Sequence, residues 1–354
     1  MPPQSGTSVP KKIESFLKNA LLLSSVVLLC LLLFEAVSRL IIDDGKSYEL
    51  EMWKYARDVK IREPRSDVGH RHRANREAEL MGAKVRTNAF GFRGPEIGEK
   101  TAPGVARIAF VGDSTTLGWG VAEQETFAEQ VIAELKRKGR KVDGFNLGVG
   151  NYNTTQELAL FRERGAKMKP DIIVLTYFIN DAEPMPSYKQ ESWLDLHSAA
   201  WILLSYRVDS LKRLFGDLPD WKKYYRGLYK PDAAGWKATQ QALGGFADVA
   251  RGLGAQLIVF NLPELRELQP YPFEDVTAKV RATVESKGVA FIDLLPAVEK
   301  LDPQGLWVTV PDPHPNGRAN TVFSGQMTKE PLAKLFGCRE WRRPMGGHKG
   351  DVAP

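Results

Sequence analysis

The sequence predicts an α/β protein in which helices cover both faces of a central parallel sheet, with one membrane-spanning helix in front of it. Two observations predict the sheet. From Ala106 onward, short apolar runs alternate with amphipathic stretches of helical length, and these runs lack the polar alternation of a half-exposed strand. A third observation predicts the membrane helix, because a long apolar run stands close to the N-terminus.

The apolar runs predict strands at 107–111, 142–147, 172–178, 256–262 and 289–294. The stretches between them predict helices at 127–138, 155–168, 236–253 and 275–286. Strands separated by helices of this length pair in parallel through crossover connections. In such a sheet we expect chemistry at the carboxyl ends of the strands.

The N-terminal apolar segment, residues 20–42, would span roughly 34 Å as a helix, which is enough to cross a bilayer. Its charges Glu35 and Arg39 stand four residues apart near one end, where they can pair on one helix face. Lysines before the segment and acids after it predict a cytoplasmic N-terminus. A cleaved signal peptide is the alternative, since residues 36–38 form a small-x-small site, but the length of the run favours a retained anchor.

These features divide the chain into parts. We expect a cytoplasmic N-terminus, a transmembrane helix, a linker or strap, an α/β domain and a polar tail, at 1–18, 19–42, 43–84, 85–337 and 338–354. Within the domain, an aromatic-rich insertion at 182–235 is too apolar to be disordered. It is expected to form a helical subdomain that serves as a lid or wall of the site.

Charge and cysteine content exclude some functions. The formal net charge is +6, but the basic residues are dispersed among acids and form no patch of the kind that binds nucleic acid. Cys30 and Cys338 stand in dissimilar surroundings and have no metal-ligand spacing. We therefore expect no nucleic-acid partner, no metal ion and no organic cofactor.

Ser114 follows the first predicted strand, in the stretch VGDSTTLGWG. On a tight strand-to-helix turn a serine exposes both its hydroxyl and its own N–H, as a nucleophile and an oxyanion donor require. An ordinary helix N-cap is the alternative interpretation. Gly112 lets the turn form without a Cβ, and Gly118 and Gly120 are expected to leave room for substrate.

Asp312 and His314 each precede a proline, in the stretch PDPHPNGRAN. A following proline holds a residue extended, so the two side chains face the same way and the carboxylate can orient the imidazole. A surface loop with a chance histidine is the alternative. Asn180 ends the apolar run of the third strand, where its amide N–H suits an oxyanion, although Asn-Asp also opens many turns.

Four stretches in chain order resemble the SGNH (GDSL-like) hydrolase superfamily over roughly residues 85–335: Ser114 in GDSTTLGWG, the loop after Asn146, Asn180, and Asp312 with His314. The resemblance implies a flavodoxin-like three-layer α/β/α fold. It implies Ser114 as the nucleophile, His314 as general base and acid, and Asp312 as the group that orients the histidine. Asp312 departs from the family pattern, because it stands two residues before the histidine and the family's acid usually stands three before.

The resemblance also implies an oxyanion hole. Its donors would be the Ser114 N–H, the Asn180 amide and one backbone N–H in the loop after Asn146. Counting from Asn146 places this third donor at Asn151, with Gly150 directly before it. A backbone donor needs no particular side chain, so both positions stay open.

The stretch FGFRGPEI and the aromatic insertion resemble bacterial envelope members associated with exopolysaccharide modification. We expect a serine esterase in the bacterial inner membrane, with its catalytic domain in the periplasm, that removes acetyl groups from carbohydrate through an acyl-enzyme. Its partners would be the acylated glycan and envelope polysaccharide machinery. Two alternatives remain: an O-acyltransferase acting on an exopolysaccharide or envelope glycan, and a non-catalytic glycan-binding or assembly protein.

Overall fold

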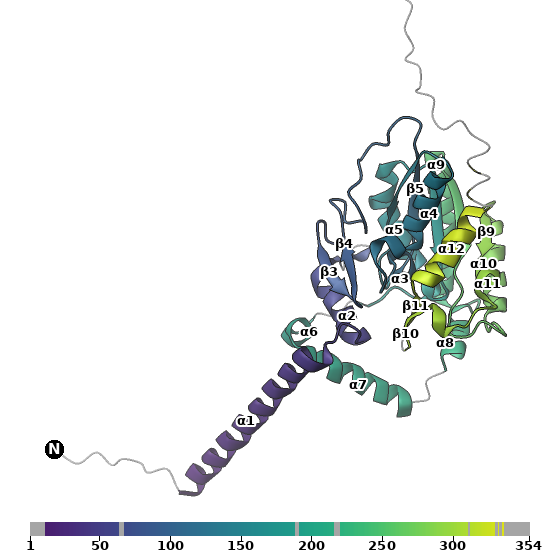
Figure 1. Ribbon diagram of the computed structural model, residues 1–354. Helices are drawn as coiled ribbons and strands as arrows, with labels where there is room; N and C mark the ends of the chain where they lie inside the picture. Colours follow the sequence, from purple (N-terminus) through teal and green to yellow (C-terminus); the bar gives the residue numbers. More distant parts are fainter. Residues whose placement is uncertain are drawn as a thin grey trace, which may run out of the picture.

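The computed structural model describes residues 11–63, 67–187, 191–215, 220–310, 312–329, 332 and 335. A five-stranded parallel sheet lies at its centre, in the order β6-β5-β7-β8-β9 (Figure 1). The strands are β5 (Ala106–Val111), β6 (Val142–Asn146), β7 (Ile172–Tyr177), β8 (Gln256–Asn261) and β9 (Ala290–Asp293). All five were predicted to within a residue of each end, and taken in chain order their arrangement is 2-1-3-4-5, the order of flavodoxin-like folds. The predicted tail at 338–354 lies outside the described residues.

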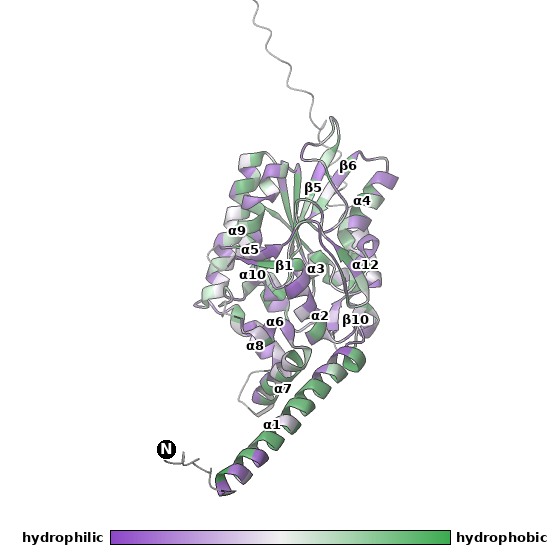
Figure 2. Ribbon diagram, turned by 90° about the vertical axis from the view of Figure 1, so that its left-hand side faces the viewer, coloured by the Kyte–Doolittle hydropathy of each residue, from purple (hydrophilic) through white to green (hydrophobic). Residues whose placement is uncertain are grey.

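Helices cover both faces of the sheet, as Figure 2 shows with the sheet between them. On one face lie α4 (Phe127–Arg137) and α12 (Gly317–Lys329). On the other lie α5 (Thr154–Glu163), α9 (Ala234–Leu253) and α10 (Glu274–Glu285). Every residue of β5 and β7 is buried, which explains why these strands read as continuous apolar runs. The predicted helix at 155–168 divides into α5 and the 3-10 turn η4 (Gly165–Met168).

The N-terminal helix α1 (Lys11–Val37) projects from the domain and continues through the π-helical turn η1 (Ser38–Ile42) (Figure 1). Residues 12–42 have the length and apolar composition to cross a membrane, and none of their most apolar window is buried. A signal sequence has the same properties, so length and composition alone do not separate the two.

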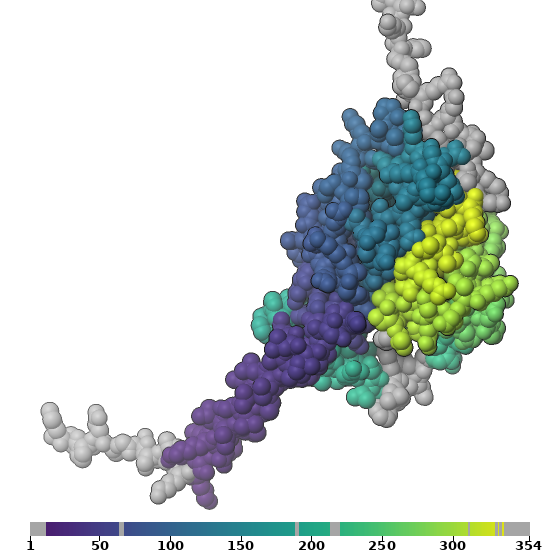
Figure 3. All heavy atoms as spheres, in the orientation of Figure 1, coloured from purple at the N-terminus to yellow at the C-terminus, as the bar shows by residue number. Residues whose placement is uncertain are grey.

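Residues 43–84 fold against the domain, where the sequence suggested a linker or strap. They form α2 (Tyr48–Lys54), η2 (Tyr55–Val59) and two antiparallel hairpins, β1 (Lys60–Glu63) with β2 (Gly69–His72) and β3 (Glu77–Leu80) with β4 (Ala83–Arg86). We call this segment the strap. Figure 3 shows it as a layer along one flank of the domain. Strands of four residues are too short to show a period in the sequence, which is why the strap's structure was not predicted.

The insertion is helical, as expected. It contains α6 (Trp193–His197), α7 (Ala199–Phe215) and α8 (Trp221–Leu228). The remaining elements lie near the carboxyl ends of the strands or in their connections: α3 (Ser114–Leu117), η3 (Glu123–Glu125), η5 (Ile179–Ala182), α11 (Leu295–Val298), η6 (Gln304–Leu306) and the hairpin of β10 (Trp307–Thr309) with β11 (Asp312–Pro315).

Candidate active site

Ser114 is the first residue of α3, directly after the turn that ends β5. Asp113 caps this helix, because its Oδ1 accepts hydrogen bonds from the Thr115 N–H at 2.8 Å and the Thr115 hydroxyl at 2.7 Å. A Cβ on Gly112 would lie 2.1 Å from Thr116 Oγ1, so only glycine fits there. The turn therefore fixes Ser114 at the carboxyl edge of the sheet.

His314 lies in β11, and its side chain contacts Ser114. Its Nε2 is 2.9 Å from Ser114 Oγ, and its Nδ1 is 2.5 Å from Asp312 Oδ1. The same carboxylate oxygen accepts the His314 backbone N–H at 3.1 Å. The structure therefore brings the three predicted residues into one hydrogen-bonded row, and the two-residue spacing between Asp312 and His314 is compatible with direct contact.

Trp119 completes the surroundings of Asp312. Its indole N–H donates to Asp312 Oδ2 at 2.9 Å, and both side chains are buried. Burial alone would raise the pKa of the Asp312 carboxyl, but the hydrogen bonds from His314 and Trp119 outweigh it and hold that pKa below its usual range. The carboxylate can therefore stay ionised beside the histidine. Trp119 was not predicted to belong to the site, although it stands in the VGDSTTLGWG stretch.

Gly118 and Gly120 do not line the space beside Ser114. A Cβ on Gly120 would lie 2.4 Å from Val308 Cγ1, and one on Gly118 would lie 2.5 Å from Thr126 Cγ2. Both glycines also have positive φ, which side chains rarely adopt. The expectation that they make room for substrate is wrong, because they permit close packing of the protein's own loops.

Asn180 lies in η5, directly beyond β7, and lines a cavity with Ser114 and His314. Its Oδ1 is buried and has no hydrogen-bond partner among the residues that the structure describes. Its Nδ2 also donates to no described protein group, but unlike Oδ1 it is not fully buried. An amide placed this way presents its N–H groups to the cavity.

The loop after Asn146 separates the two candidate backbone donors. The Gly150 N–H already donates to the Tyr55 hydroxyl at 2.9 Å. The Asn151 N–H makes no hydrogen bond to any described residue, and Asn151 lines the cavity that holds Ser114. Asn151 adopts a φ of 66°, a conformation that asparagine tolerates better than most residues. The geometry therefore favours Asn151 over Gly150 as a free donor.

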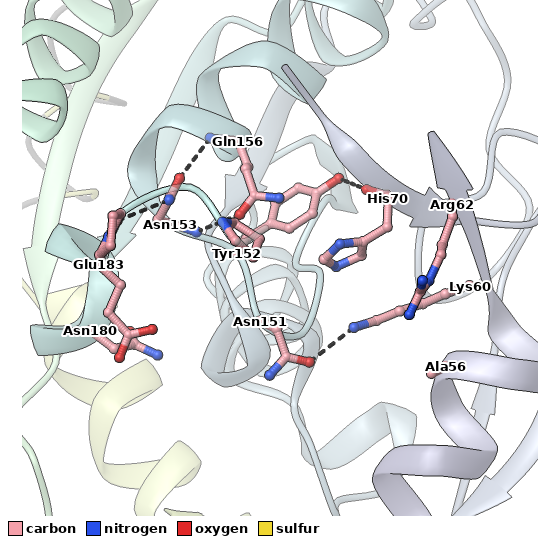
Figure 4. A pocket seen from close by; sticks show the side chains of 12 residues that line it. Ala56, Lys60, Arg62, His70, Asn151, Tyr152, Asn153, Gln156, Asn180 and Glu183 are labelled. Carbon is pink, nitrogen blue, oxygen red and sulfur yellow. Dashed lines mark hydrogen bonds between the residues drawn. The ribbon is translucent and has the colours of Figure 1, made fainter. Parts of the chain in front are cut away.

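The strap holds this loop through three buried side chains, those of Tyr55, Lys60 and His70, and Figure 4 shows the last two. Lys60 Nζ donates to the Gly150 carbonyl at 2.7 Å and to Asn151 Oδ1 at 3.0 Å. His70 Nε2 lies 3.0 Å from the same carbonyl, so it must be the donor. Tyr55 accepts from Gly150 and lies 2.6 Å from His72 Nε2, to which it donates. None of these residues was predicted from the sequence.

Burial shifts the titration of these groups. It lowers the pKa of Lys60 to about 7, with the charge of Arg62 as a smaller contribution. Burial, together with nearby Lys60, lowers the pKa of His70 to about 2. His70 is therefore neutral at physiological pH. Lys60 can lose its proton there and still keep two N–H groups for its two acceptors.

Two cavities meet at the candidate oxyanion donors Asn151 and Asn180. The first, of about 240 Å³, contains Ser114 and His314 together with Tyr48 and Tyr225. The second, of about 390 Å³, extends from the same two asparagines toward the strap (Figure 4). Most of the residues that line it are polar, among them Lys60, Arg62, His70, Asn153, Gln156 and Glu183.

Comparison with known proteins places this site in a family. The GDSL-like Lipase/Acylhydrolase family matches residues 110–322. Similar solved structures include TesA (18% identity, 64% of this chain and 99% of that chain, TM-score 0.41). They also include Axe2, an acetylxylan esterase from Geobacillus stearothermophilus (15% identity, 68% of this chain and 97% of that chain, TM-score 0.43). A third is a family 3 carbohydrate esterase from Clostridium thermocellum (14% identity, 66% of this chain and 98% of that chain, TM-score 0.42). A comparison with curated proteins finds no match.

The family match carries the assignment. It covers more than half of the 354 residues and contains Ser114, Asn180, Asp312 and His314. The protein therefore belongs to the GDSL-like lipase/acylhydrolase (SGNH) family, whose members are esterases and acylhydrolases.

Proposed function

We propose that this protein is a serine esterase in which Ser114 is the nucleophile, His314 the general base and acid, and Asp312 the group that orients His314. The observation that carries the proposal is the unbroken row of hydrogen bonds, 2.9 Å from Ser114 to His314 and 2.5 Å from His314 to Asp312. Because Asp312 accepts the Nδ1 proton, the Nε2 lone pair of the neutral imidazole faces the serine hydroxyl.

The reaction follows from this arrangement. Ser114 Oγ attacks the ester carbonyl as its proton passes to His314 Nε2, and His314 then returns that proton to the departing alcohol oxygen. A water molecule, deprotonated by the same nitrogen, attacks the acyl carbonyl; the bond to Ser114 Oγ breaks, His314 returns the proton to that oxygen, and the acid leaves. The Ser114 N–H, the Asn151 N–H and the Asn180 Nδ2 would stabilise the negative charge that develops on the carbonyl oxygen in both steps.

We infer that the alcohol part of the substrate is a carbohydrate and that the acyl group is acetyl. The amide N–H groups of Asn151 and the carboxylate of Glu183, which both line the second cavity, can bind hydroxyl groups. The rings of Tyr48 and Tyr225, which line the cavity containing Ser114, can pack on the C–H face of a sugar. A long acyl chain would need continuous apolar walls, whereas the ionisable side chains of Lys60, Arg62 and Glu183 interrupt the lining of the second cavity.

We further propose that residues 19–42 stay attached as a membrane anchor, with 1–18 in the cytoplasm and the catalytic domain in the periplasm of a bacterium. The support is the role of Glu35 in the folded domain. Its carboxylate accepts hydrogen bonds from the Ser198 hydroxyl at 2.7 Å, from the Ala199 N–H at 3.1 Å and from the Ala200 N–H at 3.0 Å. Cleavage at residues 36–38 would remove this cap from the start of α7.

The proposal is tested with purified full-length protein and p-nitrophenyl acetate. Ser114→Ala and His314→Ala should each abolish hydrolysis and labelling by a fluorophosphonate. Ser286→Ala, which changes an exposed serine on the far side of the sheet, should retain both. Substantial activity in either site variant would mean that another residue is the nucleophile or the base, and unlabelled wild-type protein would favour the non-catalytic alternative.

Mass spectrometry of the products separates hydrolysis from transfer. Wild-type protein incubated with an acetylated xylo-oligosaccharide should release free acetate and leave a product that is lighter by one acetyl group. Appearance of the acetyl group on an added, unacetylated oligosaccharide would instead identify an acyltransferase. Ser114→Ala is the blank for both measurements.

A further inference from the structure

Helix α7 carries a stripe of exposed apolar side chains along one face. Trp201, Leu204, Val208 and Leu211 expose 37%, 47%, 41% and 51% of their surface. Their spacing of three, four and three residues places them on one side of the helix, and we call them the apolar stripe. Single exposed apolar residues are common on protein surfaces, but four in register form a contiguous surface of the kind that marks an interaction site.

The opposite face of α7 packs inside the protein. Ala199 and Leu203 are buried in a small cluster with Leu50 and Trp53 of α2. Successive residues of a helix turn by about 100°, so Ala199 lies on the far side of the helix from Val208. Leu203 lies at least about 80° around the helix from each residue of the apolar stripe, so the stripe is not the face by which the insertion attaches to the domain.

The start of α7 is fixed to the end of the apolar helix α1. Besides the three hydrogen bonds that Glu35 accepts from residues 198–200, Arg39 Nη2 donates to the His197 carbonyl at 2.5 Å. Arg39 and Glu35 also pair with each other at 2.5 Å. Helix α7 therefore begins where α1 ends, and Figure 1 shows the two helices diverging from this junction.

The catalytic residues lie at the same end of the domain. In Figure 1, α3 and β11, which hold Ser114 and His314, lie at the end from which α1 extends, and α7 runs along that end. Helix α2 connects the two regions, since its Trp53 packs with α7 while its Tyr48 stacks beside the His314 ring at 6.4 Å. The catalytic cavity and the apolar stripe are thus held on one side of the protein.

We propose that α7 lies in the interfacial layer of the bilayer that α1 crosses, with the apolar stripe in contact with lipid and the catalytic cavity opening at the membrane surface. The inference rests on the proposed retention of α1 as an anchor. Trp201 suits the boundary between headgroups and acyl chains. Arg207 and Lys212 flank the stripe on either side, where their long stems can extend along lipid while their charges reach the headgroups. The substrate would therefore be a glycan ester presented at the membrane.

Depth-dependent quenching in vesicles tests the position of α7. The full chain, with Cys30→Ser and Cys338→Ser, is reconstituted in phosphatidylcholine–phosphatidylglycerol vesicles, and an environment-sensitive fluorophore is attached at Leu204→Cys or Val208→Cys. Bromine on the lipid chains should quench both probes, most strongly at roughly 5–10 Å below the headgroup level, and aqueous iodide should not. Gly252→Cys is the matched control, because it is exposed at the other end of the sheet and its Cβ would meet nothing within 4 Å.

A second variant tests the consequence for catalysis. Leu204→Asp with Leu211→Asp should leave hydrolysis of soluble p-nitrophenyl acetate unchanged and reduce hydrolysis of an acetylated glycolipid carried in the same vesicles. Equal rates on the glycolipid for this variant and the wild type would overturn the link between α7 and substrate. A second outcome is that iodide quenches the probes at 204 and 208 as readily as the probe at 252, in protein that alkaline carbonate cannot extract. That result would overturn the interfacial position itself.

The same experiments distinguish a failure of the interfacial position of α7 from a failure of the proposed membrane anchor or of the proposed esterase activity. Extraction of the wild-type protein by alkaline carbonate would contradict the anchor. If the wild-type protein hydrolyses p-nitrophenyl acetate no faster than Ser114→Ala, the proposed esterase activity would be contradicted. Probes protected from iodide but not quenched by lipid bromine would show that protein covers the stripe, and the lipid proposal would then be wrong.

Discussion

Tyr55→Phe tests whether the strap positions an oxyanion donor. The substitution keeps the buried ring, its edge contact with Trp119 at 5.6 Å and the Lys60 ammonium at 4.3 Å from its centre. It removes only the hydroxyl, which pairs with the Gly150 N–H and with His72. Two buried polar groups then lose a partner at about 1–3 kcal/mol each, so the free energy of unfolding should fall by about 2–6 kcal/mol.

The effect on rate follows from the loop geometry. The hydrogen bond from the Gly150 N–H to Tyr55 fixes the backbone directly before Asn151. Without this bond, the Asn151 N–H should still be present but held less firmly in position. A deleted oxyanion donor costs roughly 10²–10³ in kcat, and a loosened one should cost less, about tenfold. The KM for p-nitrophenyl acetate should change little, because Tyr55 does not line either cavity described above.

The assay pairs urea unfolding with steady-state kinetics, both below the temperature at which the variant unfolds. Tyr177→Phe is the matched control: it also removes a buried hydroxyl, which pairs with Tyr229, but it does not touch the loop after Asn146. That control should lose stability and keep its kcat. If Tyr55→Phe keeps or raises kcat while losing stability, the freed Gly150 N–H would be the better candidate for the donor, and the assignment of Asn151 would be wrong.

Three further predictions concern neighbouring groups. Asn180→Ala should lower kcat by roughly 10²–10³ with little change in KM, and a loss below tenfold would contradict its role as a donor. Asp312→Asn should lower kcat by about 10⁴, because an amide in its place favours the wrong tautomer of His314; circular dichroism and unfolding curves should establish that the variant is folded. Lys60 has a pKa of about 7 in the folded protein, below its value of about 10.4 in the unfolded chain. Between these two pH values the unfolded chain binds one more proton than the folded protein. The free energy of unfolding of the wild type should therefore increase as the pH rises from about 7 to about 10.4. Urea unfolding of Lys60→Met should show no such rise, and an equal rise in both proteins would mean that Lys60 titrates normally.

The sheet and the hydrogen-bonded row of Ser114, His314 and Asp312 could be predicted from sequence for related physical reasons. Buried parallel strands require continuous apolar runs, and such runs are visible without any knowledge of the fold. Parallel strands also bring their carboxyl ends to one edge, so residues as distant as Ser114 and Asn180 are brought together by topology alone. The extended geometry before each proline brought Asp312 and His314 onto one side, and their contact in the structure agrees with that argument.

The support of the site could not be predicted, because it depends on contacts between segments with no common period. Lys60 reaches Gly150, ninety positions further along the chain. Nothing in the local sequence of β1 indicates that its lysine is buried, since lysine is normally exposed. The only available signal was composition: His70 and His72 are two of five histidines in the chain, and both lie in the strap. Rarity alone does not specify a partner.

The burial of the strap bears on where the catalytic unit begins. Tyr55 and Val59 share one apolar cluster with Leu117 and Trp119, which lie directly beyond the catalytic turn. A lysine and two histidines are buried beside them at a cost in desolvation, which hydrogen bonds offset: Lys60 and His70 bond the Gly150 carbonyl, and His72 bonds the Tyr55 hydroxyl. A separable linker would expose such groups to water. We therefore propose that the catalytic unit starts near residue 43 and that residues 43–84 hold the loop after Asn146, the proposed oxyanion loop, in position.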